Sequence, residues 1–78
     1  MTPNNRIEIN PDIMLGKPVI KGTRIPIELI VRKLGEGASV EDLLDAYPNL
    51  KKEDIQAALI YAADTLANEM TIYLDTGT

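Results

Sequence analysis

The side chains best suited to bind a ligand in this sequence are two adjacent lysines near its middle. Lys51 and Lys52 follow the stretch Tyr47-Pro48-Asn49-Leu50, and Gln56 lies about one helical turn further on. If a helix begins here, its amino end presents two ammonium groups and an amide, as a recognition helix does in the major groove of DNA. We therefore predict that these three side chains face bases or phosphates. The alternative is a solvated helix start without a ligand.

The residue types on which most catalytic and metal sites depend are missing. The sequence contains no His and no Cys, and no Gly-rich loop follows a predicted strand, as a phosphate cradle requires. The carboxylates nearest to the lysines flank two sides of a turn; they are Asp42, Asp45, Glu53 and Asp54. Glu53 and Asp54 interact favourably with the dipole at the start of a helix, but they repel phosphate. We predict neither an enzyme nor a cofactor or metal site.

Charge is distributed unevenly along the 78 residues. Residues 1–33 carry six Lys or Arg against three Asp or Glu, whereas residues 34–78 carry two against nine. The two parts therefore have net charges of +3 and −7, within a total of −4. This asymmetry indicates either two partners of opposite character, or one polyanionic partner and a solvated acidic face. A role in solubility alone is the alternative.

A predicted pair of helices between Ser39 and Leu66 positions the lysines. Ser39 is a favourable N-cap and Asp42 follows it at capping-box spacing, so the first helix begins at Val40. Pro48 cannot continue that helix, because proline lacks the amide proton. Two helices joined by so short a turn cross steeply, which is the geometry of a helix-turn-helix. The alternative is a packed corner of a small helical domain.

The second helix of the pair has an apolar side with helical spacing. Its members recur at intervals of four, three and four; they are Ile55, Leu59, Ala62 and Leu66. We expect this stripe to face the core. Lys51 is a poor N-cap for the helix, since an ammonium group cannot accept a hydrogen bond from a free amide. Either Asn49 caps the helix instead, or the first turn frays.

Two short β-prone segments lie near the N-terminus. Residues 6–9 alternate polar and apolar side chains, and residues 17–21 are again β-prone. The two segments pair either as a hairpin or across a two-fold axis with a second copy. A two-stranded ribbon is marginal in water, so we expect it to pack on the helices or on that second copy.

A further helix is predicted to begin at Pro26, a residue suited to the first helical position. Its apolar face comprises Ile27, Ile30, Val31 and Leu34. Packed on the helix pair, it completes a mainly α, three-helix domain. Arg24 lies at its amino end, where a cation is misplaced unless an anion is close. We predict that Arg24, with Lys21, contacts phosphate; the alternative for Arg24 is a hydrogen bond to loop carbonyls or to Glu28.

The chain is expected to form one domain with two distinct ends. Residues 1–5 are predicted to be flexible, residues 6–69 to form the helix-turn-helix domain with its ribbon, and residues 70–78 to form a β-prone tail. Within that tail, Ile72, Tyr73 and Leu74 are predicted to add a strand or to offer an edge to another protein. Terminal disorder is the alternative.

A domain of this size buries only about 60% of the surface that its unfolded chain exposes. Neither disulfides nor zinc can compensate, because the chain has no Cys and no His. We therefore expect a shared interface, as in a homodimer. The first residues show no secretory signal pattern and no stretch is long and apolar enough for a membrane span, so we predict a cytoplasmic protein.

Four stretches of the sequence resemble the domain-of-unknown-function family 433. They are Gly16-Lys17-Pro18-Val19-Ile20-Lys21-Gly22-Thr23-Arg24-Ile25-Pro26-Ile27, Gly37-Ala38-Ser39-Val40-Glu41-Asp42-Leu43, Tyr47-Pro48-Asn49-Leu50 and Glu53-Asp54-Ile55-Gln56-Ala57-Ala58-Leu59. The resemblance covers roughly Ile9 to Ala67, and its first stretch is a specific signature. The sequence departs from the family pattern at Leu15, where a glycine is frequent, and at Lys51, where Thr or Ser is usual.

The resemblance implies a homodimeric domain of the homeodomain-like or winged helix-turn-helix kind. It also implies an antitoxin of a type II toxin–antitoxin pair, similar to VapB proteins, whose partner is a toxin with a PIN-like nuclease fold. Together with the lysines, it predicts an autorepressor that binds operator DNA and neutralises that toxin. The alternative is a protein-interaction module that binds a partner without binding DNA; RNA binding is disfavoured by the scarcity of aromatic residues.

Overall fold

The two β-prone segments pair with each other within one chain, which confirms the hairpin alternative. Strand β1 (Ile7–Glu8) lies antiparallel to strand β2 (Val19–Ile20), with Ile7 opposite Ile20 and Glu8 opposite Val19. Both residues of β2 are buried. The ribbon is therefore stabilised by packing on the helices, as so short a pair of strands requires in water.

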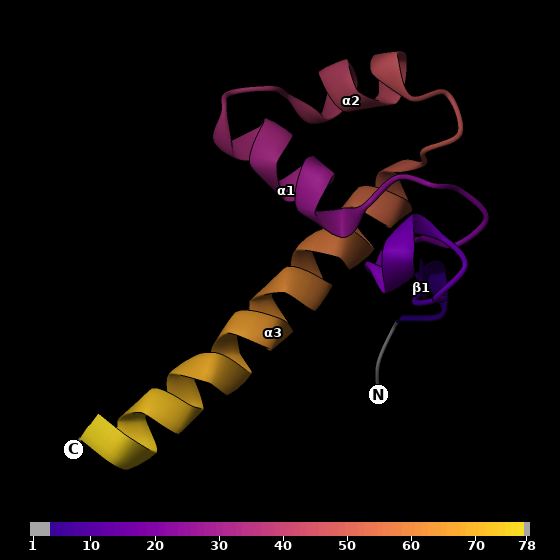
Figure 1. Cartoon of the computed structure of the whole chain (residues 1–78). Helices are drawn as coiled ribbons and strands as arrows, with labels where there is room; N and C mark the ends of the chain where they lie inside the picture. Colours follow the sequence, from indigo (N-terminus) through magenta and orange to yellow (C-terminus); the bar gives the residue numbers. More distant parts are fainter. Residues whose placement is uncertain (1–3, 78) are drawn as a thin grey trace.

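The structure is a computed structural model that describes residues 4–77, with side chains described for residues 5–68. Three helices follow the ribbon: α1 (Ile27–Gly35), α2 (Val40–Ala46) and α3 (Lys52–Gly77) (Figure 1). Short 3-10 turns, η1 (Asn4–Arg6) and η2 (Met14–Gly16), flank β1. The predicted small, mainly α domain with an N-terminal ribbon is confirmed. Within the described part of the chain, no helix combines the length and hydrophobicity of a membrane span.

Helix α2 begins as its sequence predicts. The Asp42 backbone N–H donates to the Ser39 hydroxyl at 3.0 Å, and the Ser39 N–H donates to the Asp42 carboxylate at 2.9 Å. This reciprocal pair is a capping box, which satisfies two amides that have no partner within the helix. The helix ends at Ala46, before Tyr47 and Pro48, because proline disfavours the α conformation in the residue that precedes it.

The core lies where the ribbon meets all three helices. Its buried cluster comprises Ile20, Ile27, Ile30, Leu43, Leu50, Ile55 and Ala58. Strand β2, each helix and the turn before α3 contribute to this cluster. The predicted apolar face of α1 is confirmed, since its first two members are buried and Val31 and Leu34 pack against the cluster.

The carboxyl end of α3 differs from the predicted tail. The prediction of a β-prone tail over residues 70–78 is wrong for the backbone of residues 70–77, because α3 continues to Gly77. No Pro or Gly lies between Lys52 and Thr76, so no residue breaks the helix, whereas β propensity depends strongly on context. The side chains of Ile72, Tyr73 and Leu74 lie outside the described residues, so their role in partner binding stays a prediction.

The predicted apolar stripe of α3 faces the core only in part. Ile55 is buried and Ala62 is half-buried, but Leu59 is 42% exposed and Leu66 is 58% exposed. Beyond its first turns α3 projects away from the ribbon and from α2 (Figure 1). The expectation that the whole stripe is buried is therefore wrong, because residues 63–68 of α3 extend beyond the core and are exposed.

The capping box gives a first test of the fold. Replacing Ser39 by Ala removes the hydroxyl acceptor, and we expect the free energy of unfolding to fall by about 1 kcal/mol. Urea unfolding followed by circular dichroism measures this change. The matched control is Ser39→Asn, which keeps a side-chain acceptor and should leave the stability nearly unchanged. Equal losses in both variants would show that the hydrogen bond at this position does not stabilise α2.

Candidate nucleic-acid interface

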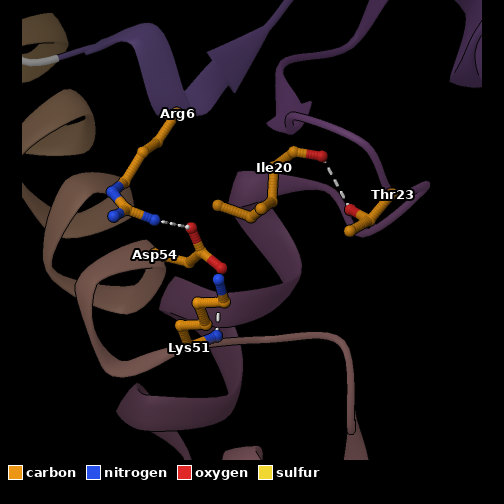
Figure 2. Close-up of polar contacts among 5 residues, drawn as sticks. All are labelled: Arg6, Ile20, Thr23, Lys51 and Asp54. Carbon is orange, nitrogen blue, oxygen red and sulfur yellow. Dashed lines mark hydrogen bonds and ion pairs between the residues drawn. The ribbon is translucent and has the colours of Figure 1, made fainter.

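A buried carboxylate fixes the start of α3. Asp54 is only 6% exposed, and its two oxygens have different partners (Figure 2). One oxygen accepts from the Arg6 guanidinium at 2.9 Å, and the other accepts from the backbone N–H of Lys51 at 3.0 Å. Because Asp54 is the third residue of α3, this second bond is half of a capping box. The Asp54 carboxylate thus satisfies the backbone N–H of Lys51 at the N-cap position. The cap of α3 comes from Asp54 and not from Asn49.

Arg6 connects this helix start to the ribbon. Its guanidinium binds Asp54, while its backbone carbonyl accepts from the N–H of Lys21 at 2.8 Å. A single residue therefore ties the turn after β2 to the amino end of α3. The sequence does not predict the pairing of Arg6 with Asp54, because an ion pair across 48 positions leaves no local sequence pattern.

The three side chains predicted to face nucleic acid at the start of α3 are open to solvent. Lys51, Lys52 and Gln56 are all exposed. Neither lysine forms an ion pair with another side chain of the described part of the chain. The buried carboxylate next to them is already occupied by Arg6, so it does not hold their ammonium groups. The arrangement leaves two positive charges free at a helix start whose backbone is held in place.

The turn after β2 presents the other two predicted cations. Thr23 fixes this turn, because its hydroxyl donates to the Ile20 carbonyl at 2.7 Å (Figure 2). The same hydroxyl accepts from the Ile25 N–H at 3.0 Å. Gly22 adopts a φ of +83°, a conformation that side chains disfavour. Lys21 and Arg24 are exposed on either side. Thr23 was missed as a supporting residue, although Thr in a Gly-containing turn is a known local signal.

Arg24 does not use the partner that its position allowed. The Glu28 carboxylate instead binds the Lys17 ammonium at 3.0 Å. The hydrogen bond and the charge of Lys17 lower the pKa of Glu28, and Arg32 adds a smaller effect in the same direction. The interpretation in which Arg24 pairs with Glu28 is therefore wrong, and Arg24 has no ion pair among the residues with described side chains.

The turn after β2 and the turn between α2 and α3 both line a shallow hollow of about 600 Å³. One side is formed by Gly22, Thr23, Arg24 and Ile25, and the other by Ala46, Tyr47, Pro48 and Asn49. Arg24 therefore lies beside the turn that leads directly into Lys51. Glu8 also lines the hollow, so its surface is not uniformly positive. The structure thus groups the Lys21–Arg24 turn and the α2–α3 turn on one region of the molecule.

The side chains that the structure describes do not form a candidate metal site. Among those residues, no group of three or more His, Cys, Asp or Glu is placed to hold an ion. Asp42 and Asp54, two of the four carboxylates considered from sequence, are each engaged in a helix cap.

Comparison with known proteins assigns the family. The model of a family described as a protein of unknown function, DUF433, matches residues 7–62, which span the ribbon, α1, α2 and the first half of α3. The chain belongs to the DUF433 family. The resemblance inferred from the sequence is therefore confirmed, and the match contains every residue proposed here to contact nucleic acid.

A solved DUF433 protein has the same fold. The crystal structure of a member from Anabaena variabilis is 35% identical and superposes with a TM-score of 0.77. The comparison covers 83% of this chain and 64% of that one.

Two relatives are uncharacterized proteins. One, from Sinorhizobium fredii, is 40% identical over 67 residues, which make up 85% of this chain but 30% of the relative. The other, from Archaeoglobus fulgidus, is 56% identical over 27 residues, or 35% of this chain and 75% of that protein. This DUF433 chain thus spans less than a third of the first relative. Neither the family description nor these names indicates a catalytic function.

The role of Asp54 can be measured against its neighbour. Asp54→Ala leaves Arg6 unpaired and the Lys51 amide without its acceptor, so we expect the free energy of unfolding to fall by about 2 kcal/mol. Glu53→Ala is the matched control, because it removes the same charge from an exposed position and should change the stability by less than about 0.5 kcal/mol. Urea unfolding of both variants makes the comparison. Similar losses at the two positions would contradict the role of Asp54.

Proposed function

We propose that this DUF433 protein is a dimeric, DNA-binding antitoxin that represses its own promoter and neutralises a PIN-like nuclease toxin. The observation that carries the proposal is the pair of exposed ammonium groups, Lys51 and Lys52, at the start of α3. They have no carboxylate partner in the described part of the chain, and the Asp54 cap fixes the backbone beneath them. Helix-turn-helix proteins contact DNA with the amino-terminal residues of the recognition helix, and Lys side chains there can bind phosphate.

The geometry around the lysines supports a contact with a polyanion. Helices α2 and α3 are joined by a short turn (Figure 1), and the side chains of Lys51, Lys52 and Gln56 at the amino end of α3 are exposed. Arg24 lines a hollow together with Tyr47, Pro48 and Asn49 of the turn that precedes α3. In the proposed complex Lys51, Lys52 and Gln56 face bases or phosphates, while Arg24 and Lys21 contact the phosphate backbone.

The total charge of −4 sets a limit on how DNA approaches. Most of the negative charge lies on α2 and α3. The exposed acidic residues of these helices include Glu41, Asp45 and Asp64. Phosphate attraction is therefore local, and a duplex must approach the region between the Lys21–Arg24 turn and the start of α3. Since the binding energy comes from displaced counterions, affinity should fall steeply with salt.

The toxin contact of the proposal is assigned to the acidic part of the chain. Residues 34–78 have a net charge of −7, which suits a basic protein surface such as the nucleic-acid site of a nuclease. Within this part of the chain, the proposed toxin contact excludes the start of α3 with Lys51 and Lys52, so that one chain can engage DNA and toxin at once. The same acidic surface favours the alternative function, a protein-interaction module that binds a partner and never binds DNA.

Charge reversal at the start of α3 tests DNA binding. In the double variant Lys51→Glu, Lys52→Glu we expect affinity for the duplex upstream of the gene to fall at least tenfold at fixed salt. The slope of log K against log salt should decrease by about 2, one for each lost phosphate contact. Fluorescence anisotropy over a salt series measures both quantities.

The matched control is Arg32→Glu, Lys33→Glu, which changes the net charge equally at the end of α1. It should weaken binding much less, because these residues lie outside the proposed contact. Equal losses in the two double variants would contradict a contact at α3. If the unmodified protein gives no DNA signal but captures a stoichiometric partner protein from its own cells, the interaction-module alternative holds instead.

A further inference from the structure

The described surface of α3 carries an apolar stripe that its own chain leaves open. Leu59 is 42% exposed and Leu66 is 58% exposed, and between them lie Ala62, half-buried, and Ala63, exposed. These four residues follow the i, i+3, i+4, i+7 spacing of a single helix face. Such a face is the usual surface for packing against a second helix. The stripe contains no charged or polar residue.

The order of residues in this stripe is the same in both directions. Leucines stand at its ends and alanines at its centre, so Leu59 and Leu66 are equally distant from the midpoint between Ala62 and Ala63. A two-fold symmetric contact requires a surface that is complementary to itself. If two copies of α3 run in opposite directions and meet at this midpoint, Leu59 of each copy faces Leu66 of the other. The two alanines then oppose each other and allow the backbones to come close.

From this symmetry we infer that the Leu59–Leu66 stripe is the interface with a second copy of the chain, in which two α3 helices cross antiparallel at Ala62 and Ala63. The inference deepens the proposed function, which requires two copies, by assigning the surface that joins them. A partner of different sequence would gain nothing from the palindromic order of the stripe. The same order is what a second copy needs.

A groove next to the stripe offers space for the leucines of the second copy. It has a volume of about 490 Å³ and lies between α1 and α3. Its apolar lining includes Ile27 and Val31 from α1 and Tyr61, Ala62 and Leu66 from α3. Lys17, Glu28 and Arg32 also line it. Because Leu66 borders the groove, the opposing Leu59 of a second copy reaches the same apolar surface. Interdigitation of this kind removes from water two leucines per chain that are now exposed.

Charge also selects this face over its neighbour on α3. Ile60 is 46% exposed, but Asp64 lies four residues beyond it on the same side of the helix. An antiparallel contact through Ile60 would place each Asp64 against Ile60 of the other copy and remove its carboxylate from water, which is unfavourable. The Leu59–Leu66 stripe has no such cost.

The crossing angle decides whether the dimer is compatible with DNA binding. Lys52 and Gln56 precede the stripe on nearly the same side of α3, so parallel alignment along the full helix would cover them. Small residues at the contact point let the two backbones approach closely, and the commonest crossing angle of packed helices is near 50°. The contact is then limited to residues 59–66, and both amino ends remain open.

The same geometry sets the distance between the two lysine pairs. In two helices that meet midway between Ala62 and Ala63, the Lys52 residues are 21 positions apart along the helix direction. At 1.5 Å per residue this gives about 30 Å. Successive major grooves on one face of DNA are about 34 Å apart. The proposed dimer thus places its two sets of lysines at a spacing suited to adjacent half-sites.

The first test is the molar mass of the full chain in solution. Sedimentation equilibrium at micromolar concentration should give twice the chain mass of 8.6 kDa. Leu66→Glu places two carboxylates in the apolar contact, and we expect it to weaken self-association at least a hundredfold, so that the chain mass is observed. Both leucines are exposed in the single chain, so its helical circular dichroism signal should be retained.

Ile60→Glu is the matched control, because it changes an equally exposed aliphatic residue on a neighbouring side of α3. It should leave the dimer intact. A monomeric unmodified chain, or a dimer that Leu66→Glu leaves unchanged while Ile60→Glu dissociates it, would overturn the interface. If the Leu66→Glu variant does not fold, the Leu66→Ala variant is tested in its place. We expect Leu66→Ala to weaken self-association at least tenfold.

The second test fixes the direction of the helices. The chain has no Cys, so a single introduced thiol reports on its own symmetry mate. Ala63→Cys lies close to the proposed axis and should form a disulfide-linked dimer on mild oxidation. Leu59→Cys should not, because its mate lies about 10 Å away along the helix and a disulfide requires α-carbons about 6 Å apart. Cross-linking of Leu59→Cys would overturn the antiparallel arrangement.

Both tests omit DNA, so their outcome is separate from that of the proposed function. A monomer in solution that still binds duplex DNA through Lys51 and Lys52 would refute the interface alone. A dimer linked through Ala63→Cys that shows no affinity for DNA would refute the DNA-binding function and leave the interface in place.

Discussion

The carboxylate of Asp54 links the amino end of α3 to the start of the ribbon, next to the apolar core that the ribbon and the three helices share. It binds Arg6 at the edge of the ribbon with one oxygen and caps the first turn of α3 with the other. Both interactions are made by a side chain that is almost fully buried, where an unpaired charge would be costly. Through Arg6, whose backbone carbonyl accepts from the N–H of Lys21, this group connects the start of α3 to the Lys21–Arg24 turn.

This arrangement separates two kinds of charge that lie next to each other in the sequence. Asp54 serves the fold, whereas Lys51 and Lys52 are left exposed for a ligand. The sequence alone shows lysines followed by carboxylates, and the carboxylates weaken the case for binding phosphate. In the structure, the guanidinium of Arg6 pairs with the carboxylate of Asp54 and compensates its charge. Asp54 therefore repels a polyanion less than an unpaired carboxylate would. A net negative protein can thus present a locally positive helix start.

The sequence predicts those features of the fold that depend on local chemistry. The Ser39–Asp42 capping box, the break at Pro48 and the apolar face of α1 follow from caps, proline and helical spacing, and all are observed. Long-range features could not be predicted, because the Arg6–Asp54 pair leaves no periodic pattern. The exposed leucines of α3 show the complementary problem, since spacing reveals an apolar face but cannot tell which chain covers it. The prediction of a β-prone tail over residues 70–78 is wrong for the backbone up to Gly77. Residues with high β propensity continue a helix there, because no Pro or Gly interrupts it before Gly77.

The most direct test of the account is an NMR titration of the full chain with the duplex from its own promoter. If the start of α3 and the turn after β2 form one binding surface, the largest backbone amide shift changes should fall in residues 49–56 and 21–24, with little change in α2. Shift changes that concentrate on residues 40–46, or that avoid residues 49–56 while the DNA is bound, would contradict it.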